Sequence, residues 1–235
     1  MRFIVLVGLI ACLLIQSYCV LGVDVSQLFP TSTYQCMKSN GYSFACIRGY
    51  CSYGGVDGNV VSNLANAKAA GLITDIYMFP CRGKSGTAQV DQMMAAIAGN
   101  TYGMVWVDVE TNPSSGCGWT SDYNGNCAFL TEIINHIRSK GKTPGIYASR
   151  YMWQTIFGSF TGCGGVASAP LWYAHYDNSP SFSDFAAFGG WTKPNIKQFQ
   201  GDVTLCGAGV DKNYYPWFAD RIKLFYWDSL FYFCP

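Results

Sequence analysis

Short apolar runs alternate with longer segments of helical periodicity from residue 22 to residue 213. The short runs are rich in β-branched and aromatic residues and are bounded by glycine, proline or asparagine, as strands commonly are. They cover residues 22–26, 44–50, 75–80, 104–110, 144–149, 171–176, 196–201 and 209–213. The longer segments carry apolar residues at helical spacing and reach a glycine near their ends, which indicates helices. They cover residues 59–72, 87–99 and 126–141, with shorter helical pieces expected around 151–157 and 181–188.

This alternation predicts an α/β fold. Strands that alternate with helices pair in parallel through right-handed crossovers, and eight of them predict an irregular TIM-like (β/α) barrel. An open doubly wound sheet is the alternative, but the chain carries neither a GxGxxG motif nor a Walker loop. A mature chain of about 210 residues can form such a barrel as a single domain.

The N-terminus has the pattern of a secretory signal peptide, which we place at residues 1–21. Arg2 is followed by an apolar stretch, residues 4–23, that is almost free of charge. A membrane anchor is the alternative, but Gln16 and Ser17 interrupt the stretch. We therefore expect no integral membrane segment after cleavage.

The rest of the chain divides unevenly. Residues 22–218 are expected to form the catalytic domain. Residues 219–235 form an atypical C-terminal tail that is rich in aromatic side chains.

The cysteines indicate an oxidising compartment. Cleavage would leave nine of them, at positions 36, 46, 51, 81, 117, 127, 163, 206 and 234. With an export signal, this number predicts structural disulfides and a secreted protein, or one in the lumen of a lysosome or phagosome. The sequence lacks CxxC and His-x-His spacing, so no metal is expected. We expect Cys117 to pair with Cys127 across a loop rich in glycine and asparagine. Because nine is an odd number, one cysteine stays unpaired, and we expect it to be Cys234.

Charge and composition narrow the function. Cleavage removes Arg2 and no acidic residue, so the 15 basic residues become 14 against 14 acidic ones. A net charge near zero gives no electrostatic reason to expect nucleic acid or an anionic membrane as partner. Aromatic residues (16%) outnumber charged ones (12%), which suits a sugar-binding groove, although most aromatic side chains must fill the core.

Four carboxylates fall at the ends of predicted strands. Asp24 lies in the first strand, Asp108 and Glu110 in the fourth, and Asp211 in the eighth. Active sites of such barrels gather at the C-terminal ends of the strands. A lone Asp24 is more often a cap and Asp211 could organise a turn, but their shared location favours one acidic site.

The spacing of Asp108 and Glu110 has a geometric meaning. Residues two apart in a strand point to the same side, with α-carbons roughly 7 Å apart. Crowded carboxylates in a partly desolvated cleft raise the pKa of at least one of them. A carboxylic acid that stays protonated can protonate the leaving oxygen of a glycoside. We expect Glu110, with its longer reach, to be that proton donor.

The motifs GVDVS, WVDVE, LWYAHYD and QFQGDVTLCGAGVDKN, in this order, resemble those of family-25 glycoside hydrolases. The similarity is greatest to the cysteine-rich secreted lysozymes of eukaryotes and runs from about residue 22 to 218. It implies an irregular β/α barrel that hydrolyses the β-1,4 bond between N-acetylmuramic acid and N-acetylglucosamine in peptidoglycan. Antibacterial defence or digestion of bacteria would be its role.

The resemblance also implies residue roles. The family's acidic site corresponds to Asp24, Asp108, Glu110 and Asp211, with Glu110 as proton donor and no metal or other cofactor. The substrate's N-acetyl group would act as nucleophile, polarised by Asp108; direct attack by an activated water stays open. We expect a monomer that acts on glycan strands.

Sugar-binding side chains are expected on the same strand ends. Tyr77, Tyr147, Trp172 and Tyr176 could stack on sugar rings, although each alone is more often core. Gln198, which alternates with Gln200, could bind N-acetyl groups or be structural. His136 is expected on a helix surface, and His175 has no second histidine nearby that would favour a metal.

Two other functions stay open. A non-catalytic peptidoglycan-binding protein would keep the barrel, but Asp108 and Glu110 are both present. A hydrolase of another N-acetylated glycan, such as chitin, would use the same acids.

Overall fold

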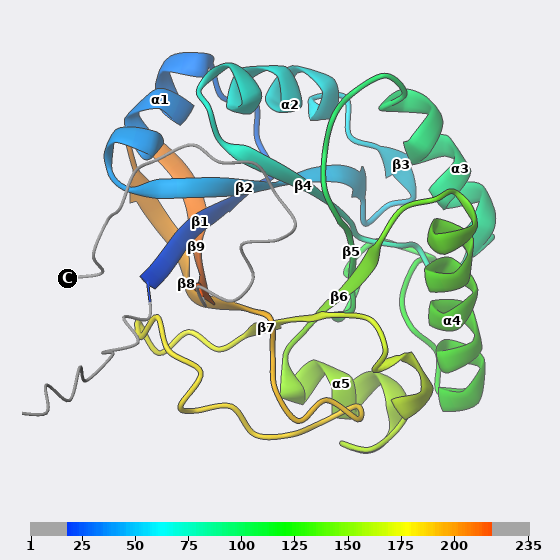
Figure 1. The fold of residues 1–235 in the computed structure, drawn as a ribbon. Helices are drawn as coiled ribbons and strands as arrows, with labels where there is room; N and C mark the ends of the chain where they lie inside the picture. Colours follow the sequence, from blue (N-terminus) through cyan, green and yellow to red (C-terminus); the bar gives the residue numbers. More distant parts are fainter. Residues whose placement is uncertain (1–17, 218–235) are drawn as a thin grey trace, which may run out of the picture.

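The computed structural model describes residues 18–217; residues 1–17 and 218–235, which include the predicted tail, most of the signal peptide and Cys234, lie outside the described part. Within residues 18–217, eight strands close into a barrel (Figure 1). They are β1 (Tyr18–Val25), β2 (Tyr42–Cys51), β4 (Ile73–Met78), β5 (Val105–Asp108), β6 (Pro144–Ala148), β7 (Leu171–Ala174), β8 (Ile196–Leu205) and β9 (Ala208–Trp217). The short strand β3 (Gly55–Val56) pairs with the end of β2.

The helices lie outside the barrel and follow the early strands (Figure 1). They are α1 (Thr31–Ser39), α2 (Val60–Ala69), α3 (Gly86–Ala96), α4 (Tyr123–Ser139), α5 (Arg150–Phe157) and the 3-10 helix η1 (Gly164–Val166). The predicted α/β barrel is therefore confirmed. No helix in the part of the chain that the structure describes is long and apolar enough to cross a membrane.

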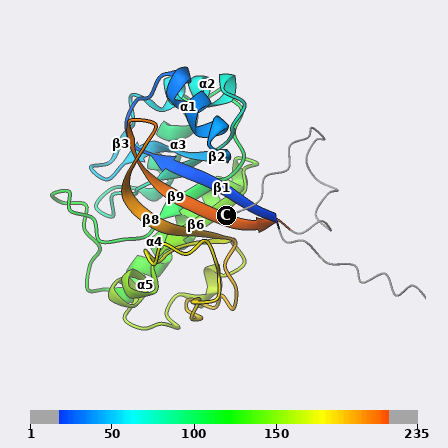
Figure 2. The ribbon, with the colours of Figure 1, turned by 90° about the vertical axis from the view of Figure 1, so that its left-hand side faces the viewer.

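The last strand corrects the expectation of uniformly parallel pairing. β9 runs antiparallel to both of its neighbours, β8 and β1, and Figure 2 shows β1 and β9 side by side. The reason is the connection: Cys206 and Gly207 alone separate β8 from β9. Two residues can join antiparallel strands, whereas a parallel pair needs a long crossover.

One predicted helix is absent, and one observed helix was not predicted. Residues 181–188 form turns, because Lys197 takes the Ser181 carbonyl and the Asp184 carboxylate as acceptors and holds this segment against β8. Helix α1 was not predicted. It begins after Pro30 and buries only Tyr34 and Met37, so its apolar face is too narrow to stand out in the sequence.

The core has an inner and an outer part. Inside the barrel, Phe44, Trp106 and Trp172 pack with smaller apolar residues. A larger cluster fills the space between strands and helices. Gly22 and Gly145 make the inner packing possible, because a β-carbon at either position would collide with the ring of Phe44 or Trp106.

The disulfides differ from the expected pairing of Cys117 with Cys127. Cys81 pairs with Cys117, Cys127 with Cys163, and Cys36 with Cys206. Cys117 returns to the loop after β4, where the Arg82 amide donates to its carbonyl. Cys127 lies on α4 beside the segment that follows α5. Both bonds therefore join neighbouring loops of the barrel, and neither closes the loop 117–127 on itself.

Three further cysteines concern the nine that were expected to remain after cleavage. Within residues 18–217 the free thiols are Cys46 and Cys51, both buried. Cys19, which cleavage after residue 21 would remove, is disulfide-bonded. The predicted cleavage point also falls inside β1, because residues 18–21 pair with β9.

Candidate active site

Three strands and the segment after β5 bring the four predicted carboxylates to one end of the barrel; Glu110 lies beyond the end of the strand in which it was predicted. Asp24 of β1 lies opposite Asp211 of β9 in the strand register. Asp108 ends β5, and Glu110 follows two residues later. Asp108, Glu110 and Asp211 line one pocket. The other lining residues are Tyr77, Tyr147, Trp172, Tyr176 and Gln198.

Asp24 lies behind this pocket and is held by two amides. Its Oδ2 accepts hydrogen bonds from Gln198 Nε2 at 2.9 Å and Asn213 Nδ2 at 2.7 Å. Burial, followed by the charge of Asp211, raises the pKa of Asp24 from 3.8 to about 8, although both amide bonds act in the opposite direction. Asp24 is therefore a well-oriented acid that binds its proton tightly.

Asp108 is the most isolated of the four. Only 5% of the residue is exposed, and its Oδ1 is buried without a hydrogen-bond partner among the described residues. Burial and the charges of Glu110 and Asp24 raise its pKa well above the ordinary value. Buried polar atoms are nearly always paired, so this oxygen is ready to bind a donor from a ligand.

Glu110 and Asp211 are nearer the solvent. The Trp119 indole donates to the Glu110 carbonyl at 2.8 Å and fixes the backbone there. Burial and the charge of Asp211 raise the pKa of Glu110. Burial also raises the pKa of Asp211, whose Oδ1 accepts the backbone N–H of Asp202 at 2.7 Å. Glu110 therefore combines access to a ligand with a raised affinity for a proton.

The aromatic residues differ in what they can offer a sugar. Trp172 is only 2% exposed, and its ring packs edge-on against Tyr147 with centroids 4.7 Å apart. Tyr147 is also buried, whereas Tyr176 is 54% exposed. Tyr176 is thus the pocket residue with the largest free face for stacking.

Gln198 has every hydrogen-bonding position of its amide in use. Its Oε1 accepts from the hydroxyls of Tyr147 at 2.6 Å and Tyr176 at 2.9 Å. Its Nε2 donates to Asp24 and to Asp211, each at 2.9 Å. An amide engaged in this way orients the acids and tyrosines around it, and would need to break a bond to hold an N-acetyl group.

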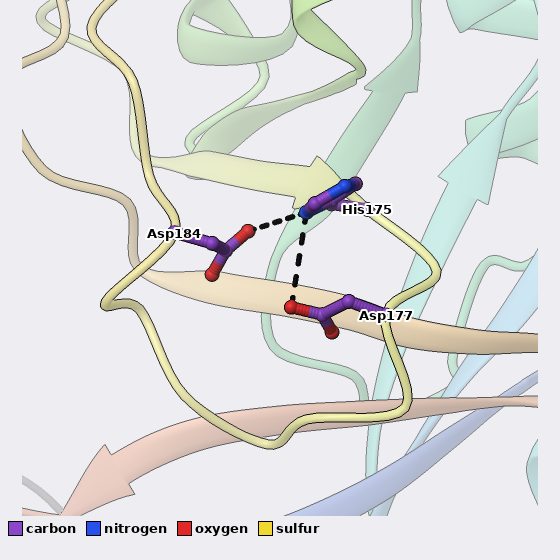
Figure 3. Close-up of side chains that lie close together, drawn as sticks. All are labelled: His175, Asp177 and Asp184. Atoms are coloured by element: carbon purple, nitrogen blue, oxygen red, sulfur yellow. Dashed lines mark hydrogen bonds and ion pairs between the residues drawn. The ribbon is translucent and has the colours of Figure 1, made fainter.

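His175 belongs to a cluster beside the site. Its Nδ1 lies 2.6 Å from Asp184 Oδ2 and 3.8 Å from Asp177 Oδ2 (Figure 3). These three side chains could face one cation, but Lys197 Nζ, itself fully buried, lies 2.7 Å from each of the two carboxylates. The ammonium group already serves as the cation. The cluster fastens the β7–β8 loop, which has no helix within residues 175–195 and carries Tyr176.

Sequence reasoning missed Asn213 and Lys197. Asn213 lies two residues after Asp211 in β9, so strand periodicity places both on one face. That signal was present in the motif GVDKN. Lys197 gave no comparable signal, since a lysine in a strand usually faces solvent.

Comparisons with known proteins agree with this geometry. The family model described as "Lysozyme-like protein 1" matches residues 16–199. The "Probable GH family 25 lysozyme 2" of Dictyostelium discoideum is 40% identical over 220 residues, covering 92% of this chain and all of the relative. The chain belongs to glycoside hydrolase family 25. A second family-25 relative from that organism, "Probable GH family 25 lysozyme 4", is 41% identical over 201 residues and covers 83% of this chain and 90% of the relative.

The solved structure of the bacterial lysozyme from Streptomyces coelicolor is also similar. It has a TM-score of 0.70 and 26% identity, with 86% of this chain and 94% of that chain covered. This family-25 member is therefore a glycoside hydrolase of the lysozyme type, and its pocket of carboxylates and aromatic rings suits that chemistry.

Proposed function

We propose that this glycoside hydrolase cleaves the β-1,4 bond between N-acetylmuramic acid and N-acetylglucosamine in peptidoglycan strands, with Glu110 as proton donor. The observation that carries the proposal is the contrast between Glu110, which lines the pocket with a raised pKa, and Asp108, which is deeper and has an unpartnered oxygen. Glu110 can donate a proton to a ligand in the pocket, and the unpartnered oxygen of Asp108 can accept a hydrogen bond from that ligand.

The steps follow from these positions. Glu110 transfers its proton to the glycosidic oxygen as the bond from that oxygen to the anomeric carbon breaks. The N-acetyl oxygen of the same sugar bonds to the anomeric carbon, while Asp108 Oδ1 accepts the N–H of that group. Water then attacks the anomeric carbon, returns a proton to Glu110, and releases the N-acetyl oxygen. The exposed ring of Tyr176 stacks on a sugar ring and holds it in position.

The direct test is Glu110→Gln assayed on peptidoglycan. Glu132→Gln is a matched control, because Glu132 lies on α4 and is the chain's other glutamate. Removing an essential general acid costs about 10²–10⁴-fold, so Glu110→Gln should lose clearing activity while Glu132→Gln keeps it. Full activity in Glu110→Gln would exclude the assigned role.

Two further measurements separate the open alternatives. Activity on chitin oligosaccharides with none on peptidoglycan would identify a different N-acetylated substrate, and binding without cleavage would identify a non-catalytic wall-binding protein. The anomer formed first, followed by NMR, separates the routes: attack by the N-acetyl group retains the configuration, whereas single attack by water inverts it.

We also propose that the enzyme works outside the cytosol, in a secreted form or in a lysosomal or phagosomal lumen. The three disulfides within residues 18–217 support this, since such bonds persist in oxidising compartments. A processed form that keeps β1 whole would begin no later than Tyr18. N-terminal sequencing of the exported protein locates the cleavage point directly.

A further inference from the structure

Two amides, Gln198 and Asn213, contact Asp24 in a matching way, and we call them the amide clamp. In each, the NH₂ end donates to Asp24 Oδ2. In each, the carbonyl end accepts from an aromatic side chain: Trp172 Nε1 donates to Asn213 Oδ1 at 2.8 Å, and two tyrosine hydroxyls donate to Gln198. The two amides are direct cross-strand partners on β8 and β9.

This arrangement prevents either amide from turning over. A rotated Asn213 would point its NH₂ at the Trp172 indole N–H, which replaces an attractive contact by a repulsive one, and it would no longer donate to Asp24. The side chain is fully buried, so no water offers an alternative partner. Asn213 therefore has one permitted orientation, which is set by Trp172.

We propose that Asn213, oriented by Trp172, is a positioning residue of this hydrolase: it holds Asp24 Oδ2 as a hydrogen-bond acceptor and so confines the proton of Asp24 to Oδ1. This role rests on the proposed function only for its effect on turnover. Its effect on Asp24 itself can be measured in the absence of any substrate.

The ionisable groups that face Asp24 could also change its titration. They come from five strands of the barrel and from the loops after β5 and β7. The carboxylates are Asp211, Asp108 and Glu110, and the remaining groups are Cys46, Tyr77, Tyr147 and Tyr176. Burial raises the pKa of the thiol and of the three phenols, so they stay neutral wherever Asp24 titrates. The three other acids are therefore the groups whose ionisation can change together with that of Asp24.

The test uses Asn213→Ala and Trp172→Phe, with Trp106→Phe as matched control. Trp106 is also buried inside the barrel, and its indole also donates a hydrogen bond, in this case to the carboxylate oxygen Asp75 Oδ2 at 2.9 Å. All three changes disturb inner packing, but only the first two touch the clamp. The carboxyl carbon of Asp24 is titrated by ¹³C NMR in each protein, and kcat and KM are measured on peptidoglycan fragments.

Loss of the Asn213 hydrogen bond should raise the titration midpoint of Asp24 by about one to two pH units, since a bond to a charged group favours the ionised form. Trp172→Phe should raise it by less, and Trp106→Phe should leave it unchanged. The kcat of Asn213→Ala should fall about ten- to hundred-fold with KM nearly constant, as expected for a misplaced active-site group.

An unchanged midpoint in Asn213→Ala would overturn the proposal, as would an equal shift in Trp106→Phe. If Asn213→Ala does not fold, Trp172→Phe alone decides, since it keeps an aromatic ring and removes the donor. If the wild-type protein fails to cleave peptidoglycan while the midpoint shifts as described, the proposed substrate is wrong and the clamp stands.

Discussion

Replacing Asp24 with asparagine should stabilise the fold while it removes activity. Burial and Asp211 raise the pKa of Asp24 from 3.8 to about 8. At pH 7 the folded protein therefore holds this proton, whereas the unfolded chain releases it. The difference between 7 and 3.8 is 3.2 units, and at about 1.36 kcal/mol per unit the unfolded state gains on the order of 4 kcal/mol.

The sign follows from the raised pKa. A carboxyl whose pKa is higher in the folded state stabilises the fold fully below its unfolded pKa, here 3.8, and this contribution is lost as the pH rises toward about 8. An asparagine at position 24 can accept the same two amide N–H donors through its Oδ1 and has no proton to lose. The variant should thus gain stability over wild type at pH 7 and little at pH 4.

Urea unfolding of both proteins at pH 4 and pH 7 measures this difference. Asp91→Asn is a suitable control because hydrogen bonds from Lys140 and His136 lower the pKa of Asp91, so its loss should not stabilise the protein. The reasoning would be refuted if Asp24→Asn were no more stable than wild type at pH 7. It would also be refuted if the gain in the free energy of unfolding were the same at pH 4 as at pH 7.

Two other predictions concern the disulfides and the buried ion pairs that stabilise the barrel and its loops. Replacing Cys36 and Cys206 by serine opens a loop with a sequence separation of 170 and should cost about 5 kcal/mol, against about 4 kcal/mol for Cys81 and Cys117 at a separation of 36. Urea unfolding that gives the reverse order would contradict the loop-entropy account. Lys197→Met leaves two carboxylates without their buried cation and should cost about 3–5 kcal/mol. It should also raise KM by loosening the loop that carries Tyr176, while Lys193→Met, at an exposed position, changes neither the Tm nor KM.

The sequence predicted the strands well because each is a short apolar run between breakers. All eight predicted runs overlap observed barrel strands, and the helices expected at 59–72, 87–99 and 126–141 correspond to α2, α3 and α4. These elements bury a wide apolar face, which periodicity detects. Helix α1 buries only two side chains and left no such pattern.

What escaped prediction depends on contacts between distant residues. The disulfide of Cys36 with Cys206 spans most of the chain, and cysteine spacing contains no information about it. The turns at 181–188 depend on Lys197, which lies in a later strand. The four acids were predicted to share a location because strand ends are local features, but the amides that orient Asp24 could be recognised only once β8 and β9 were paired.

The irregular last strand accounts for the arrangement of the site. If β9 were parallel to its neighbours, only its last residues would lie at the mouth of the barrel. Asn213, two residues after Asp211, would then lie further out than Asp211. Because β9 is antiparallel, Asp211 lies opposite Asp24 at the mouth, and Asn213, two residues on, lies one step deeper and opposite Gln198. The strand thus supplies an acid to the pocket and an amide beneath it from the same face. A register shift of one residue would turn both away from the barrel interior, so the short Cys206–Gly207 connection, fastened to α1 through Cys36, stabilises the geometry on which the acids depend.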